Sequence, residues 1–386
     1  MDAVPGFLDA LAARLVPACD PAVVQAVFAR ASAGYTGPRG RDGLRVTAIA
    51  PSGEPFEASV TGGAGRSSAA LRYVTETATG MPFFGPRLAA QRAALDDLVG
   101  WLPVAAREAA GELRAAVDVL FPDPAAVPAR RRFATTFGIV HRAEVPDGIA
   151  GLKLYGNLRA GDPEAVATTA AEALARLAGR WPAFARLGDV VGDLAFLEPH
   201  FATIEVDAAG RLGHKLYLRA RRANAAGLAV AARRVGAELA PVADALRQGG
   251  IDETVWRRRF FVCAAVGDSA GTGDSAGAGT GDSAGAGGGG GRGAGRGGGA
   301  DDVGLSVHLS AKALRLDRAD MARVARTLVS RYGDPAGLDA LDGAVARAGG
   351  AARWATTVVG LGLAPGEGVG KVNVYASTDG EAIVRG

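Results

Sequence analysis

The sequence predicts an α+β protein in which a single ten-stranded antiparallel β-barrel is surrounded by helices. Three observations lead to this prediction. Pairs of short β-rich segments, each joined by a connection, recur five times along the 386 residues. Alanine-rich helical segments separate the pairs. Directly joined strands pair antiparallel, and one sheet of ten strands with its helices on one side is expected to close into a barrel.

Three of the five predicted hairpins have turn-forming segments, which are Gly62-Gly63-Ala64-Gly65, Pro146-Asp147-Gly148 and Asp207-Ala208-Ala209-Gly210. Alternating polar residues in these strands predict a polar barrel interior that is large enough to hold a ligand. The strand pairs are 55–60 with 70–77, 133–141 with 151–159, 196–206 with 212–221, 258–264 with 304–310, and 354–363 with 369–376.

Helices are expected wherever apolar residues recur at a spacing of three or four. The first is amphipathic and runs from Phe7 to Val16, and Asp20-Pro21 provides an N-cap and a first-turn proline for the second. The later helices are expected over most of 86–120, from Asp162 to Arg180, and over 225–248, 317–331 and 337–348.

The composition excludes several classes of protein. Lys and Arg number 43 against 40 Asp and Glu, and no block of like charge suggests a nucleic-acid partner. Two cysteines cannot form a disulfide framework, and four scattered histidines lack zinc-ligand spacing. The start of the chain is not that of a signal peptide, and no apolar run is long enough to span a bilayer. We therefore expect a soluble cytoplasmic protein without a membrane partner.

Residues 267–301 form a segment of Gly, Ala, Ser, Thr and Asp that cannot bury apolar surface, so we expect a disordered insert within one domain spanning 1–386. Gly-Asp-Ser-Ala-Gly occurs in it at 267–271, 273–277 and 281–285. These pentapeptides match a nucleophile elbow literally, but they lack the strand and helix that an elbow requires. Arg292 and Arg296 are too few for an RNA-binding footprint.

A Lys-x-Tyr pattern is the most informative feature of the predicted strands. It occurs at Lys153 and Tyr155, again at Lys215 and Tyr217, and more loosely at Lys371 to Tyr375. Alternate strand residues share a face, so each segment offers an ammonium group and a phenol together. Three such strands could converge on one polyanion. Alternatively, each Lys-x-Tyr is only a solvated strand face.

Five short motifs then carry a resemblance that covers most of the chain outside the insert. They are Pro55-Phe56-Glu57-x-Ser59, Leu71-Arg72-Tyr73 with Glu76, Lys153-x-Tyr155, Pro199-His200-Phe201 before Lys215-x-Tyr217, and Val372-Asn373-Val374-Tyr375-Ala376. In this order they resemble the aromatic prenyltransferases of the dimethylallyltryptophan-synthase type. The fold of that family is a ten-stranded αββα barrel, the ABBA or PT barrel.

The resemblance implies a role for each matching residue. Glu57 resembles the acidic residue that holds the N–H group of the aromatic acceptor. Arg72, Lys153 and Lys215 resemble the cations that grip the diphosphate of the donor. The tyrosines that shield the allylic cation would be Tyr155, Tyr217 and Tyr375. A further arginine usually stands two residues before the third-hairpin lysine, where this chain has Gly213. Arg219 and Lys371 are the candidates that could replace it.

The implied function is transfer of a dimethylallyl or longer prenyl group from an allylic diphosphate to an indole, a tryptophan-like compound, a phenol or an aromatic peptide, in alkaloid or other secondary metabolism. Cations would stabilise the departing diphosphate, tyrosines would shield the carbocation, and a base would remove the ring proton. His141 is one candidate base, although a lone strand histidine is more often structural. Asp96-Asp97 lacks the third aspartate of a magnesium-binding cluster, so we expect no metal and no other cofactor.

Two other functions stay open. The barrel could bind or carry an isoprenoid or another amphiphilic anion without catalysis, or it could be a scaffold. Glu57 favours the enzyme, because an anion carrier gains nothing from a carboxylate beside its cations. Its alternative role is an ion pair with Arg72 across the first hairpin, since cross-strand pairs of opposite charge are common.

Overall fold

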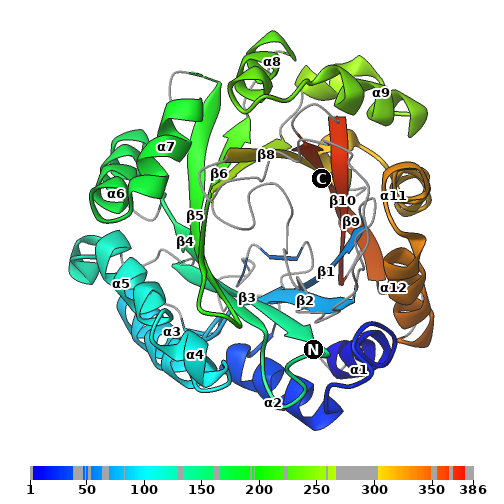
Figure 1. Cartoon of the computed structure of the whole chain (residues 1–386). Helices are drawn as coiled ribbons and strands as arrows, with labels where there is room; N and C mark the ends of the chain where they lie inside the picture. Colours follow the sequence, from blue (N-terminus) through cyan, green and yellow to red (C-terminus); the bar gives the residue numbers. More distant parts are fainter. Residues whose placement is uncertain are drawn as a thin grey trace, which may run out of the picture.

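The computed structural model describes residues 3–37, 47, 49–50, 54–62, 69–81, 83–128, 134–159, 166–191, 194, 196–220, 225–257, 260–266, 303–348, 354–364 and 368–378. Its ten strands form one closed antiparallel barrel in the order β1-β10-β9-β8-β7-β6-β5-β4-β3-β2 (Figure 1). This confirms the predicted fold class and all five hairpins. The predicted insert lies outside the described residues, as does the start of the helix predicted from Asp162 to Arg180. The strands are β1 (Phe56–Gly62), β2 (Ala70–Thr75), β3 (Thr135–Arg142), β4 (Gly151–Asn157), β5 (Leu197–Asp207), β6 (Leu212–Ala220), β7 (Phe260–Val266), β8 (Val303–Ser310), β9 (Trp354–Ala364) and β10 (Gly368–Thr378).

Helices surround the barrel on its outside (Figure 1). The helix predicted over 225–248 is divided at Gly236, which has a φ of +69° that an α-helix cannot contain. The helix predicted over 86–120 is likewise three helices. The α-helices are α1 (Ala3–Leu15), α2 (Pro21–Ala31), α3 (Phe84–Val99), α4 (Val104–Arg107), α5 (Gly111–Leu120), α6 (Val166–Arg180), α7 (Pro182–Val191), α8 (Ala225–Arg234), α9 (Ala240–Gln248), α10 (Ala311–Leu314), α11 (Arg318–Tyr332) and α12 (Pro335–Arg347), and two short 3₁₀ helices are η1 (Pro124–Ala126) and η2 (Glu253–Arg257).

Strand alternation separates an apolar outer face from a polar inner face. In β4, Leu152 and Leu154 are buried in the layer between barrel and helices, whereas Lys153 and Tyr155 point inward. The register carries this alternation from strand to strand, because Lys153 lies opposite Gly138 on β3 and opposite Glu205 on β5. The helices therefore pack on the apolar outer face, and the polar side chains of the inner face point into the barrel.

Aromatic packing joins the two ends of the chain. The ring of Phe7 on α1 stacks on Trp354 of β9, with centroids 3.9 Å apart, and both rings contact Phe56 of β1. Phe28 and Tyr73 extend the cluster to α2 and β2. Because β1 pairs with β10, this cluster covers the seam at which the barrel closes.

A buried ion pair holds α3 to the end of β2. Arg87 Nη1 lies 3.4 Å from Glu76 Oε1, and both side chains are almost completely buried. Arg87 Nη2 also donates to the backbone oxygens of Thr79 and Met81, and Gln91 donates to Glu76. Simple alternation would place Glu76 inside the barrel with Arg72. The strand instead ends at Thr75, and Glu76 meets α3.

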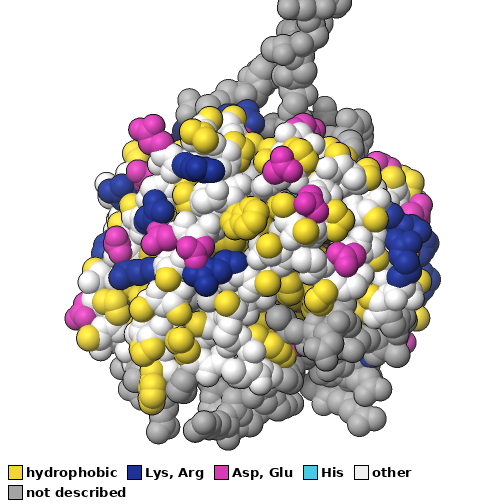
Figure 2. Space-filling model, turned by 90° about the horizontal axis from the view of Figure 1, so that it is seen from below, with side chains coloured by type: hydrophobic (Ala, Val, Ile, Leu, Met, Phe, Trp, Pro, Cys, Tyr) yellow, Lys and Arg dark blue, Asp and Glu magenta, His cyan; other side chains and the backbone are white. Residues whose placement is uncertain are grey.

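Acidic and basic side chains lie side by side on the face of the molecule shown in Figure 2, in keeping with the nearly balanced charge. Surface ion pairs such as Arg180–Glu112 join neighbouring helices. Within the described part of the chain, every helix is too short or too polar to cross a membrane.

Candidate functional site

A cavity inside the barrel is lined by side chains from strands on all sides. It encloses about 950 Å³ of space without protein atoms, including the part that is open to solvent. Its lining combines hydroxyl, ammonium, guanidinium and phenol groups with small residues. Its polar lining residues include Ser59, Thr61, Arg72, Lys153, Tyr155, Lys215, Tyr217, Cys263, Ser306, His308, Lys371, Asn373 and Tyr375.

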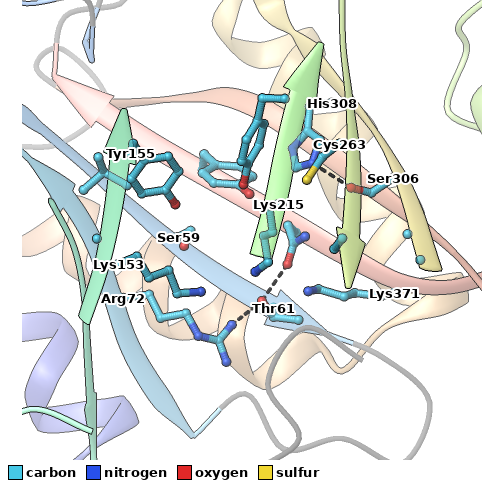
Figure 3. A pocket seen from close by; sticks show the side chains of 18 of the residues that line it. Ser59, Thr61, Arg72, Lys153, Tyr155, Lys215, Cys263, Ser306, His308 and Lys371 are labelled. Atoms are coloured by element: carbon cyan, nitrogen blue, oxygen red, sulfur yellow. Dashed lines mark hydrogen bonds between the residues drawn. The ribbon is translucent and has the colours of Figure 1, made fainter. Parts of the chain in front are cut away.

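Four cationic side chains converge at one level of this cavity (Figure 3). Lys153 and Lys215 come from β4 and β6, Arg72 from β2 and Lys371 from β10. Arg72 donates to Thr61 Oγ1, which in turn donates to Asn373 Oδ1 at 2.6 Å. The cations predicted from the sequence thus share one site, and of the two candidates proposed to replace the missing arginine it is Lys371 that lines the cavity.

Glu205 on β5 is a charged residue of this site that the sequence analysis missed. Its Oε2 atom lies 2.8 Å from Lys153 Nζ and 3.0 Å from Lys215 Nζ, and its side chain is only 11% exposed. In the register Glu205 lies opposite Gly213, the position at which the family resemblance expects an arginine. The sequence did contain a signal for this residue. Glu205 alternates with the apolar residues Ile204 and Val206, which predicts that its carboxylate points to the inside of the barrel.

The side chains of three tyrosines and one histidine form a ring of aromatic groups next to the cations. Tyr155 lies 5.8 Å from Tyr217, and His308 lies 5.9 Å from both Tyr217 and Tyr375, measured between ring centroids. Burial raises the pKa of Tyr155 to about 12, and it raises the pKa values of Tyr217 and Tyr375 well above that of an ordinary phenol. The phenols are therefore neutral at ordinary pH.

His308 on β8 is the second functional candidate that the sequence analysis missed. Its Nε2 atom lies 2.9 Å from Ser306 Oγ (Figure 3). Burial, helped by Lys371 and Lys215, lowers its pKa to about 3, so the imidazole is neutral. Ser306 and His308 alternate with Leu305, Val307 and Leu309, a pattern that indicates an inward-facing pair.

Glu57 on β1 shares the inner face with Ser59 and Thr61, beyond the ring of aromatic side chains. Thr357 Oγ1 donates to Glu57 Oε2 at 3.3 Å. Burial raises the pKa of Glu57 to about 8, and the Thr357 hydrogen bond opposes this shift. The register places Ser59, not Glu57, opposite Arg72, so the contact found for Glu57 is with Thr357 and not the cross-hairpin ion pair.

Two site predictions are corrected by the structure. His141 lies on the outer face of β3, opposite Leu71, where Nε2 lies 3.3 Å from the Tyr73 hydroxyl and Nδ1 lies 3.1 Å from the Gly148 carbonyl oxygen. It is fully buried under the helices and does not line the cavity, so it is not placed to act as the base. Arg219 lies two residues beyond Tyr217, away from the lysines. The pKa of His200 is lowered mainly by burial, then by the charge of Arg159 and then by that of Arg219.

Glycines on neighbouring strands provide the space that the functional side chains occupy. A Cβ atom at Gly138 would lie 3.0 Å from Tyr155 Cε2 and 3.2 Å from Lys153 Cβ. One at Gly360 would lie 2.8 Å from His308 Nδ1. The barrel wall is therefore shaped around the tyrosine, lysine and histidine side chains.

The described residues contain no group of three or more His, Cys, Asp or Glu side chains that could hold a metal ion. The two cysteines, Cys19 and Cys263, are both buried free thiols. Burial raises the pKa of Cys263, so this thiol is protonated although it lines the cavity. The chemistry of the cavity thus rests on ammonium, guanidinium, phenol, imidazole and carboxyl groups.

Comparison with known proteins gives similarity in structure and none in sequence. No protein-family model matches the chain, and no curated protein matches it. Among solved structures, 6-dimethylallyltryptophan synthase from Micromonospora olivasterospora, in complex with DMASPP and Trp, has a TM-score of 0.66 at 20% identity, over 99% of this chain and 97% of that one. 5-Dimethylallyltryptophan synthase from Streptomyces coelicolor has a TM-score of 0.65 at 18% identity, over 99% and 97%.

A third similar structure is the prenyltransferase PriB in a ternary complex with L-tryptophan and dimethylallyl thiolodiphosphate. Its TM-score is 0.66 at 18% identity, over 99% of this chain and 96% of that one. At such low identities the likeness establishes the fold. The chain has the ten-stranded barrel of these proteins over nearly its whole length.

Proposed function

We propose that the protein is an aromatic prenyltransferase that transfers a prenyl group from an allylic diphosphate to an aromatic acceptor. The proposal rests on one observation, which is that four cationic side chains and a group of aromatic side chains line the same interior cavity. The similar barrels support it, because two of those structures hold tryptophan and an analogue of dimethylallyl diphosphate. Incubation with dimethylallyl and geranyl diphosphates against indoles, phenols and aromatic peptides, followed by mass spectrometry, tests it.

The donor diphosphate would bind between Arg72, Lys153, Lys215 and Lys371. Glu205 offsets one of these charges, so the four cations retain an excess of three positive charges for a polyanion. When the C–O bond of the donor breaks, its electron pair leaves with the diphosphate. Fixed cations stabilise this developing charge.

The allylic cation would lie against Tyr155, Tyr217 and Tyr375. Neutral aromatic faces attract a cation and separate it from water. Glu57 would accept a hydrogen bond from the N–H or O–H of the acceptor and make its ring more nucleophilic. A ring carbon would then form the new C–C bond, and loss of the proton from that carbon would restore aromaticity.

We expect Lys153→Ala and Lys215→Ala each to weaken donor binding by about 1.5–3 kcal/mol, the range for a charge-assisted hydrogen bond, and to affect acceptor binding less. Calorimetry with dimethylallyl thiolodiphosphate measures this. Glu205→Gln is the matched variant, and it is expected to change donor affinity in the opposite direction. It removes a negative charge from the site, so it should strengthen donor binding. Weaker binding in Glu205→Gln would show instead that the carboxylate mainly positions the two lysines.

Prenyl transfer is expected to proceed without a metal. The positive charge that magnesium would supply to the leaving group is supplied in this proposal by Arg72, Lys153, Lys215 and Lys371. Excess EDTA should therefore leave the turnover rate unchanged. Loss of turnover with EDTA that magnesium restores would contradict the proposal that these four side chains suffice.

We place the reaction in the cytoplasm, since both cysteines are free thiols and reduced cysteines are usual in that compartment. Tryptophan and other indoles are the first acceptors to test, because tryptophan is the acceptor in the similar complexes.

A further inference from the structure

Of the four aromatic side chains grouped in the cavity, three are tyrosines and the fourth is the imidazole of His308. His308 lies between Tyr217 and Tyr375 at the same distance from both rings. The allylic cation would be held at this level, so the acceptor carbon that attacks it must also come close to His308. Unlike a phenol, a neutral imidazole has an unprotonated nitrogen that can accept a proton.

Within the described part of the chain, the carboxylate, thiol and phenol groups near the cavity are engaged or unsuitable as bases. Glu205 is held by two lysine ammonium groups. Glu57 is hydrogen-bonded to Thr357, and the proposed mechanism uses it to hold the acceptor N–H group. Cys263 is a protonated thiol, and the three tyrosines are protonated phenols. His141 lies outside the barrel.

We infer that His308 is the catalytic base that takes the ring proton from the acceptor after the new C–C bond has formed. The inference rests on the proposed prenyl transfer. In this step the ring C–H bond breaks, its electron pair returns to the aromatic system, and the proton moves to a nitrogen of His308. The imidazolium then passes the proton to the released diphosphate, and the neutral imidazole is restored.

The surroundings of His308 suit this role. Burial, and then the charges of Lys371 and Lys215, disfavour the imidazolium form, which keeps the nitrogen lone pair available before the reaction and speeds loss of the proton afterwards. A weak base is sufficient, because an alkylated aromatic cation is a very strong acid. Ser306 fixes the orientation of the ring through Nε2, and Gly360 leaves the space that the imidazole occupies, because a Cβ atom there would lie 2.8 Å from Nδ1.

The test uses dimethylallyl diphosphate with L-tryptophan, unlabelled and ring-deuterated, or with the best acceptor of the panel in both forms. In the wild type, loss of the proton should be fast, so kcat should show no primary isotope effect. His308→Phe keeps an aromatic wall but has no base. We expect its kcat to fall at least tenfold and a primary isotope effect to appear, while binding of dimethylallyl thiolodiphosphate is retained.

Two further variants keep the test decisive. His308→Gln retains a hydrogen-bonding group for Ser306 but is not a base, so it should behave like His308→Phe even if that variant folds poorly. Ser306→Ala removes only the orienting hydrogen bond and should lower kcat less. Unchanged kcat, or a fall in kcat without an isotope effect in both His308 variants, would overturn the inference and leave the proposed function intact. No transfer by the wild type to any acceptor would overturn both.

Discussion

Above pH 8, where Glu57 is mainly in its carboxylate form, Glu57→Gln is expected to lower turnover about a hundredfold or more, the scale of a lost acid–base group, while donor binding is retained. The glutamine keeps the shape of the side chain and one acceptor oxygen, but it removes the charge that polarises the acceptor N–H group. Turnover and binding of dimethylallyl thiolodiphosphate are measured on the same preparation. Normal turnover in this variant would remove Glu57 from the mechanism.

The pH dependence gives a second readout for Glu57. Burial raises its pKa to about 8, so the carboxylate form increases as the pH rises through about 8. The kcat/KM for the acceptor should therefore increase over this range in the wild type but not in Glu57→Gln. Thr357→Val is the matched control: it removes the hydrogen bond that lowers the pKa of Glu57, so the increase should move to higher pH.

Thermal stability gives an independent check that Glu57 does not form an ion pair with Arg72. Between the unfolded pKa of 4.5 and the folded pKa of about 8, the folded state binds more protons at Glu57 than the unfolded state does. The contribution of this group to the free energy of unfolding therefore falls as the pH rises through that window. Glu57→Gln should be at least as stable as the wild type at pH 8, whereas loss of an ion pair would make it less stable.

Arg87→Met is expected to lower the free energy of unfolding by about 3–5 kcal/mol, the cost of leaving one partner of a buried ion pair without the other. Glu76 would lose its cation, and the backbone oxygens of Thr79 and Met81 would lose their donor. Urea unfolding followed by circular dichroism measures the change.

The double variant Arg87→Met with Glu76→Gln is the control for the Arg87 prediction. It removes the buried charge as well as its partner, so it should recover part of the loss. Burial already raises the pKa of Glu76, which Arg87 opposes, so the cost of Arg87→Met should be greater at high pH than at pH 6. A change of less than about 1 kcal/mol in Arg87→Met would contradict the view that this pair holds α3 in place.

Strand alternation made much of the site predictable from the sequence. A period of two is sufficient to place Lys153 with Tyr155, and Lys215 with Tyr217, on one face of each strand. Helical spacing was similarly sufficient for most of the outer layer. The break at Gly236 could not be foreseen from spacing alone, because apolar residues continue through it.

The remaining errors come from register and depth, which a sequence does not specify. His141 lies on the strand before Lys153, but the register places Gly138 opposite Lys153, so His141 points to the other side of the sheet. Arg219 lies on the correct strand but two residues too far along it. His308 and Glu205 were missed because neither belongs to a Lys-x-Tyr pattern, and only the closed barrel brings them next to the lysines and tyrosines.

The central claim is that the barrel interior transfers a prenyl group, and one assay tests it most directly. The full chain is incubated with dimethylallyl diphosphate and the acceptor panel, and prenylated product and released diphosphate are quantified together. We predict an acceptor product heavier by one prenyl group, with one diphosphate released for each product formed. Binding of the donor without any product would indicate an isoprenoid carrier and would contradict the claim, and so would the absence of donor binding.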